Sequence, residues 1–176
     1  MLKRPRYEEA RDLLLSLVRP GETERVPLEE SAGRVLAQDL YAAENVPAFD
    51  RSPYDGYALR AEDVKDASRE APVTLRVLEE IPAGSAPTQP VIAGTASRVM
   101  TGAPIPEGAD TVIMFEKTEF TETSVTLFAP VRLGDNVVRA GEDIRAGALL
   151  VSAGERIDAA RAGSLAAQGV TEPLVY

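Results

Sequence analysis

The sequence predicts an α+β fold with two subdomains, a mixed helix-and-strand domain and a small β-barrel-like domain inserted into it. Apolar residues recur at helical spacing only near the two ends, in Tyr7–Val18 and in the stretch from Asp158 to Gln168. Between about Ala71 and Val137 no helical pattern occurs, and short apolar runs alternate with proline and glycine, as in small barrels and sandwiches. The mixed domain is therefore expected to comprise residues 1–48 and 137–176, and the barrel-like domain residues 49–136.

The N-terminal part is predicted to be scaffold. Tyr7–Val18 has one apolar face and one charged face, and Pro20 with Gly21 ends the helix. A second short helix is expected at Val26–Gly33, with Gly33 at its C-terminus. Arg34–Tyr41 is expected to be a strand.

Asn45–Asp63, with the sequence NVPAFDRSPYDGYALRAED, shows neither helical spacing nor strand alternation. Ser-Pro and Asp-Gly are turn signals, and Gly56 can adopt a positive φ without steric cost. The stretch is expected to form an ordered loop that presents acids beside aromatic rings, and long ordered loops are often functional. A helical turn is expected within Ala61–Ala67.

The expected strands of the barrel-like part differ in pattern. Val73–Leu78 alternates, as a half-buried strand does, whereas Thr111–Phe115 is a continuous apolar run of the kind found in a fully buried strand. Phe120–Val131 is expected to supply another strand.

The C-terminal part is expected to return to the first domain. Gly147–Val151 is predicted as strand. Asp158 is predicted to cap a helix that runs to Gln168 and ends at Gly169, and Leu174–Tyr176 to form a last short strand.

Composition excludes several classes of chemistry. The 176 residues include no cysteine and no histidine, which rules out disulfides, iron–sulfur clusters, thiolate zinc sites, cysteine nucleophiles and an imidazole base. An oxygen-rich inventory of this kind suits a hard cation such as Mg²⁺. The net charge of −9 argues against nucleic acid as a partner. No signal peptide and no membrane span of about 20 apolar residues is expected, so a cytoplasmic location is the expectation.

Three stretches resemble a known family in the same order along the chain. They are NVPAFDRSPYDGYALRAED at Asn45–Asp63, RVMTGAPIPEGADTVIMFE at Arg98–Glu116 and VRAGEDIRAGALLVSAGERI at Val138–Ile157. Together they are similar to the signature motifs of the molybdopterin molybdenumtransferases, which include the bacterial MoeA proteins and the E domain of gephyrin. In that family the chain continues into a large α/β domain, which would begin where this sequence stops at Tyr176. The resemblance therefore identifies the sequence as the N-terminal region of such an enzyme.

The resemblance also selects candidate catalytic residues, namely Asp55, Thr101 and Asp143. Residue types alone leave plainer interpretations open for each of them: an ordinary Asp-Gly turn, a proline-held connection between strands, and a solvated acid beside Glu142. By the family's pattern, Asp55 and Asp143 would also be the metal ligands. Substrate-binding roles are implied for neighbouring residues: Ser52, Tyr54, Gly56, Gly102 and Glu142.

The implied activity is insertion of molybdate into adenylylated molybdopterin, with release of AMP and with Mg²⁺ as cofactor. In the family the site lies between this region of one subunit and the large α/β domain of the other subunit of a homodimer. The resemblance thus implies that this chain carries half of the site, is inactive alone, and works with the C-terminal domains and other proteins of molybdenum cofactor biosynthesis. Two alternatives remain open, a non-catalytic dimerisation or binding module of the same fold, and a carboxylate-pair hydrolase such as a glycosidase.

Overall fold

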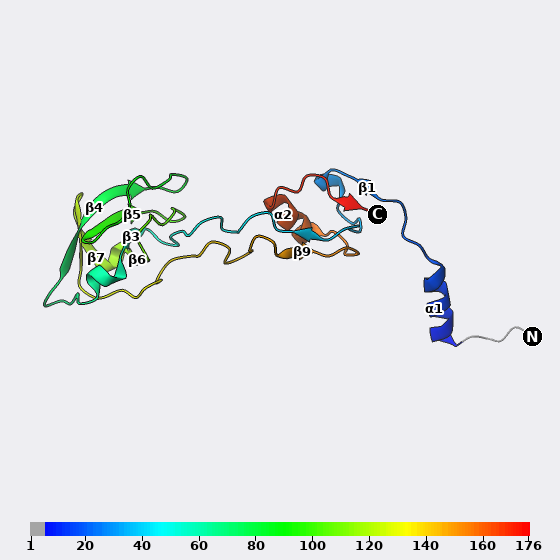
Figure 1. The fold of residues 1–176 in the computed structure, drawn as a ribbon, viewed down its shortest axis with the longest axis horizontal. Helices are drawn as coiled ribbons and strands as arrows, with labels where there is room; N and C mark the ends of the chain where they lie inside the picture. Colours follow the sequence, from blue (N-terminus) through cyan, green and yellow to red (C-terminus); the bar gives the residue numbers. More distant parts are fainter. Residues whose placement is uncertain (1–5) are drawn as a thin grey trace, which may run out of the picture. The chain divides into compact units, whose positions relative to one another are not determined.

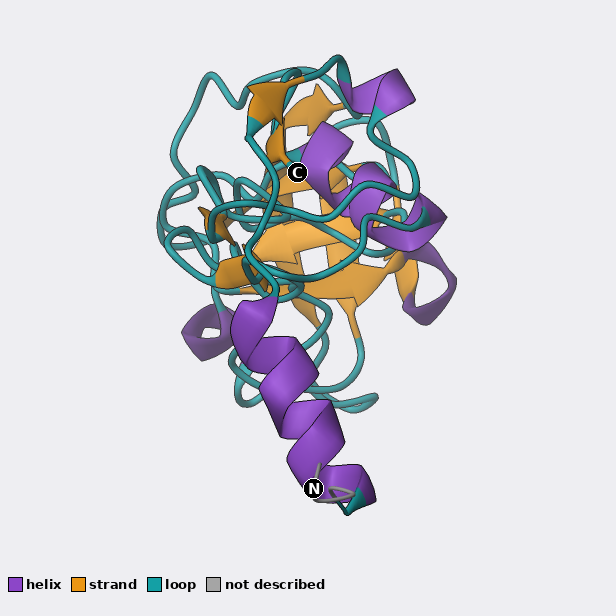
Figure 2. Ribbon diagram, turned by 90° about the vertical axis from the view of Figure 1, so that its right-hand side faces the viewer, coloured by secondary structure: helices purple, strands orange, loops and turns teal. Residues whose placement is uncertain are grey.

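The computed structural model describes residues 6–176, in which helices and strands are mixed (Figure 2). The chain divides into two compact units: Met1–Tyr41 with Leu149–Tyr176, and Ala42–Ala148. These limits lie several residues from the expected ones, because the segments that flank the barrel pair with each other, as in the bridge between Val46 and Ile144. Residues 1–5 of the expected first domain lie outside the described part.

The first unit contains two helices and short paired strands. Helix α1 (Tyr7–Leu17) follows the expected limits closely, and none of its residues is buried. Strand β1 (Glu24–Arg25) pairs with β10 (Leu174–Val175), and β2 (Leu40–Tyr41) pairs with β9 (Leu149–Val151). A small apolar core joins them to the second helix through six buried residues: Val26, Leu36, Val151, Ile157, Leu165 and Val175.

Helix α2 (Ala159–Ala167) begins as the sequence predicts. The Asp158 carboxylate accepts a hydrogen bond of 2.9 Å from the Arg161 N–H, which satisfies one of the unpaired donors of the first turn. Gly169 follows the helix with a φ of 73°, as expected for the residue that ends it.

The helix predicted at Val26–Gly33 is wrong beyond one turn, since only the 3₁₀ turn η1 (Leu28–Glu30) forms. The N–H groups of Val26 and Leu28 donate instead to Pro173 and Thr171. The segment is therefore held by the C-terminal part of the chain. The Gly33 N–H, which a continued helix would direct to the Glu29 carbonyl, donates to the Ile157 carbonyl at 2.8 Å. Likewise, the strand expected at Arg34–Tyr41 is reduced to isolated bridges and β2.

The second unit is built on one curled six-stranded sheet, a half-barrel (Figure 1). Its strand order is β6-β3-β5-β4-β8-β7, so β6 and β7 form the edges and the sheet does not close. Only β4 and β5 pair in parallel. The strands are β3 (Gly56–Leu59), β4 (Val73–Ile81), β5 (Thr95–Val99), β6 (Thr111–Met114), β7 (Thr118–Phe120) and β8 (Ser124–Leu127).

Both faces of this sheet are covered. Tyr57, Leu59 and Ile113 belong to the core on one face, whereas Ala58 and Val112 belong to the core on the other. Because successive residues of a strand point to opposite faces, β3 is buried at every position. This explains why the sequence shows no alternation there.

Several local expectations need correction. Phe120–Val131 is not one strand, because the N–H of Thr121 donates to the Ser124 carbonyl and turns the chain between β7 and β8. The helical turn expected in Ala61–Ala67 is the 3₁₀ turn η2 (Ala61–Val64), and another, η3 (Phe115–Lys117), follows β6. Within residues 6–176, no helix is both long enough and apolar enough to cross a membrane.

Candidate functional site

The three signature stretches meet along the extended segment around Arg51. On one side Arg51 and Val138 exchange backbone hydrogen bonds of 2.9 and 3.0 Å. On the other side the Gly102 N–H donates to the Ser52 carbonyl at 2.8 Å, and the Ser52 N–H to the Ala103 carbonyl at 2.9 Å. The first stretch, drawn in cyan in Figure 1, therefore lies between the second and the third. Motifs far apart in the sequence are brought into one place.

Asp55 and Thr101 form the centre of the candidate site. Oδ1 of Asp55 accepts two hydrogen bonds from Thr101, one from its N–H at 2.7 Å and one from its hydroxyl at 2.8 Å. Both residues are exposed. The Thr101 N–H, followed by its hydroxyl, lowers the pKa of Asp55 below its ordinary value. Oδ2 makes no hydrogen bond with any described residue, so a charged oxygen faces outward.

Gly56 is required here for a different reason from the one the sequence suggests. Its φ is not positive, and the residue starts β3 rather than an Asp-Gly turn. A Cβ at this position would lie 2.1 Å from the carbonyl oxygen of Ile113 on β6. The close approach of β3 to β6 thus demands glycine, and it fixes Asp55 at the start of a buried strand.

Of the other predicted substrate-binding residues, Ser52 and Tyr54 belong together. Ser52 is fully buried; its hydroxyl donates to the Tyr54 carbonyl and accepts a 3.3 Å hydrogen bond from the Tyr54 N–H. Its hydroxyl is therefore used to brace the loop. The Tyr54 side chain is about half exposed, at 47%. Gly102 has a φ of 84°, which only glycine adopts readily. Substrate binding by these residues stays a prediction.

The two acids of the third stretch have separate environments. Glu142 accepts a 3.1 Å hydrogen bond from the Arg139 N–H and so closes its own turn. Asp143 donates its N–H to the Val46 carbonyl at 2.9 Å, and its exposed carboxylate has no hydrogen bond or ion pair with the residues that the structure describes. Asp143 is the acid of this pair that remains available to a ligand.

Sequence reasoning missed Asp50, an acid of the same loop. Its carboxylate accepts a hydrogen bond of 2.8 Å from the Ala140 N–H and an ion pair of 2.6 Å from Arg139. The Ala140 N–H lowers the pKa of Asp50, partial burial opposes this, and Arg139 lowers it further. Asp50 therefore joins the first stretch to the third. Its position among three acids of one loop gave no signal that distinguished it.

The structure brings Asp55 and Thr101 together but shows no contact of either with Asp143. The Val46–Ile144 bridge beside Asp143 and the Arg51–Val138 bridge are five residues apart along the loop, a span of up to about 18 Å in an extended chain. Within residues 6–176, no group of three acids that could hold a metal ion is present. A metal bound here would complete its coordination with water or with oxygen atoms of a ligand.

Replacing Thr101 by valine is expected to raise the pKa of Asp55 without restoring its ordinary value. The substitution removes the hydroxyl donor but keeps the N–H, which is the larger cause of the lowered pKa. A lowered pKa means that ionised Asp55 stabilises the folded state. This contribution to folding stability is present above the ordinary pKa of aspartate and is lost as pH falls through the pKa of Asp55 in the folded state. Carboxyl ¹³C NMR titration measures the shift. Thr101→Ser, which keeps the hydroxyl, should titrate as the unsubstituted chain does; an unchanged pKa in Thr101→Val would contradict the assigned bond.

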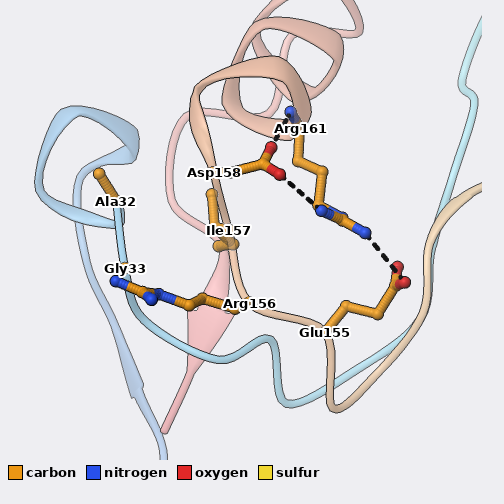
Figure 3. A pocket seen from close by; sticks show the side chains of 7 residues that line it. All are labelled: Ala32, Gly33, Glu155, Arg156, Ile157, Asp158 and Arg161. Atoms are coloured by element: carbon orange, nitrogen blue, oxygen red, sulfur yellow. Dashed lines mark hydrogen bonds and ion pairs between the residues drawn. The ribbon is translucent and has the colours of Figure 1, made fainter.

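Two cavities lie away from the candidate catalytic residues. One of about 610 Å³ lies in the first unit, where Asp158 and Glu155 both point to the Arg161 guanidinium and Arg156 points toward Gly33 (Figure 3). The acids of this cavity are thus ion-paired. A second cavity of about 810 Å³ borders η3 and β7. Neither lining contains any of the three predicted catalytic residues.

Comparisons of the sequence with known proteins agree with one another on the family. A family model described as the MoeA N-terminal region (domain I and II) matches residues 6–169. The molybdopterin molybdenumtransferase of Bacillus subtilis is 47% identical over 141 residues, which cover 78% of this chain and 33% of the relative. That of Synechococcus elongatus is 40% identical over 175 residues, covering 97% of this chain and 43% of the relative.

A solved structure shows the same fold. The crystal structure of a molybdopterin biosynthesis moeA protein from Pyrococcus horikoshii OT3 matches with a TM-score of 0.89 and 39% identity. The match covers 96% of this chain and 45% of that one. The chain therefore spans less than half the length of these relatives.

Proposed function

This chain belongs to the MoeA family of molybdopterin molybdenumtransferases, and we propose that it supplies part of a site that inserts molybdate into adenylylated molybdopterin and releases AMP. The observation that carries the proposal is the Asp55–Thr101 pair, in which two hydrogen bonds hold one carboxylate oxygen and leave the other facing outward. Exposed Asp143, on a segment paired with the same loop, is the third candidate group.

In the proposed site, residues of this chain orient the Asp55 carboxylate and supply negative charge. Thr101 fixes the direction of the Asp55 carboxylate, and its two hydrogen bonds lower the pKa of that carboxylate. Asp55 and Asp143 are each an exposed carboxylate of the kind that would hold Mg²⁺, because this ion binds through one or two carboxylates and completes its shell with water and substrate phosphate oxygens. When bound, Mg²⁺ would offset charge on the phosphate that leaves. Tyr54, which precedes Asp55 in the chain, has a half-exposed side chain.

The proposal extends to the assembly. The two compact units are the two subdomains that the family description numbers I and II. The remaining part of the site comes from C-terminal domains contributed by a second subunit of a homodimer, so this chain alone is inactive. Family membership favours this function over a carboxylate-pair hydrolase.

The test is a chimeric enzyme in which residues 6–169 of this chain replace the matching region of the Bacillus subtilis relative. We expect it to insert molybdate into adenylylated molybdopterin and to release AMP, whereas the isolated 176-residue chain shows neither reaction. A folded, dimeric but inactive chimera would support the alternative, a non-catalytic module of the same fold. Turnover by the isolated chain would contradict the shared site.

A further inference from the structure

Glu79 on β4 is an acid whose carboxylate is fully engaged by a loop. Its oxygens accept hydrogen bonds from the Thr88 N–H at 3.0 Å, the Thr88 hydroxyl at 2.6 Å and the Gln89 N–H at 3.0 Å. Burial acts to raise the pKa of Glu79, but these hydrogen bonds outweigh it and the pKa lies below its ordinary value. Hydrogen bonds to a charged acceptor are stronger than neutral ones. Glu79 therefore pins the segment that follows β4.

The pinned loop, residues 82–89, begins against the turn that carries the candidate threonine. The Met100 N–H donates to the Ile81 carbonyl at 3.1 Å. A Cβ at Gly102 would lie 3.7 Å from the Cβ of Ala83, which is van der Waals contact. The start of the loop and the Asp55–Thr101 pair are thus neighbours.

The residues that follow the loop contact the middle of the second signature stretch. The Val91 N–H donates to the Glu107 carbonyl at 2.8 Å. A Cβ at Gly108 would lie 2.1 Å from the Val91 carbonyl oxygen, so only glycine permits this approach. Contacts at both ends place residues 82–91 alongside residues 100–108.

Between these contacts the loop offers hydrogen-bond donors to solvent. Residues 82–86 are all exposed. The Ser85 hydroxyl and the N–H groups of Gly84 and Ala86 donate to none of the residues between 6 and 176. The Ser85 N–H between them already donates to the Pro82 carbonyl at 3.1 Å, so the donors that remain for an anion are these two N–H groups and the Ser85 hydroxyl. Backbone N–H groups in a turn can bind anions.

We propose that residues 82–89 form a wall of the substrate site that binds the diphosphate group of the adenylylated substrate, and that Glu79 is a positioning residue that holds this wall in place. The inference rests on the proposed function for the identity of the substrate. It also answers an electrostatic need. The chain carries a net charge of −9, and Asp55 is ionised, so an anionic substrate requires donors close to that carboxylate.

The first test uses the 176-residue chain and inorganic pyrophosphate. Amide chemical shifts of residues 84–86 should change saturably on titration. Glu79→Ala should weaken this binding by about 10-fold, the effect of losing correctly placed hydrogen bonds. Glu79→Gln keeps acceptor oxygen for the two N–H groups and should recover most of it. Glu122→Ala removes an equal charge on the β7–β8 turn and should bind as the unsubstituted chain does. Unmoved loop amides, or equal affinity in Glu79→Ala, would overturn the proposal.

The second test uses the chimeric enzyme. Glu79→Ala should raise KM for adenylylated molybdopterin by about 10-fold and change kcat little, the pattern of a lost binding contact. A fall in kcat at constant KM would contradict the proposal that residues 82–89 bind the substrate. An inactive chimera together with pyrophosphate binding at residues 84–86 would reject the proposed function alone. An active chimera without that binding would reject this inference alone.

Discussion

Replacing Asp55 by asparagine in the chimeric enzyme is expected to lower kcat by about 10²- to 10³-fold, the range seen when one preorganised electrostatic group is removed from an active site. Asparagine has the same size, and its side-chain oxygen can still accept the two hydrogen bonds from Thr101. The loop should therefore keep its conformation while an uncharged NH2 group replaces the outward-facing charged oxygen. The measurement is AMP release and molybdate insertion at saturating substrate.

The matched control is Asp66→Asn, which removes the same charge from an exposed position after η2 in the same unit. It should leave kcat unchanged. Turnover retained in Asp55→Asn would remove the Asp55–Thr101 pair from the chemistry. A comparable loss in both variants would indicate that net charge, and not the position of Asp55, determines the rate.

Local sequence signals predicted the parts of the fold that depend on local chemistry. Tyr7–Leu17 is helical, as its apolar spacing predicted, although none of its residues is buried, and Asp158 caps α2 because its carboxylate reaches an unpaired N–H. Strand β6 is buried from Thr111 to Ile113, as its continuous apolar run predicted, and Met114 is half-buried. The motif resemblance likewise selected Asp55 and Thr101, which the fold joins directly.

Other features depend on strand or hydrogen-bond partners that are distant in the sequence, so no local sequence pattern predicted them. The sequence of strand β3 does not alternate between polar and apolar residues because both faces of the strand are covered. It was therefore predicted to be a loop. Strand β5 was missed because four of its five residues are buried, so its sequence does not alternate between polar and apolar residues. In the sequence Asp50 and Glu79 cannot be distinguished from ordinary surface acids. Their role depends on hydrogen bonds with Ala140 and Thr88, which only the folded structure brings close to them.

Gly56→Ala is expected to destabilise the β unit by about 3 kcal/mol, the upper part of the range for overpacking. The new methyl group would lie 2.1 Å from the Ile113 carbonyl oxygen and 2.9 Å from its carbon. These are backbone atoms of β6, so no side chain can rotate away and the two strands must separate. The separation would expose Tyr57, which is fully buried and packs edge-on against Phe115 at 5.2 Å between ring centroids.

Hydrogen exchange measures this loss for the β unit alone. Opening free energies of the strand amides of β3, β5 and β6 should fall together in Gly56→Ala, while those of α2 stay the same. Gly163→Ala is the matched control, because that glycine lies inside α2 with no atom within 4 Å of the added Cβ. It should stabilise α2 by about 0.5–1 kcal/mol, the helix preference of alanine over glycine. Unchanged protection of β3 in Gly56→Ala would mean that the β3–β6 contact is looser than 2.1 Å implies, and Asp55 would then lack the rigid support on which the proposed site depends.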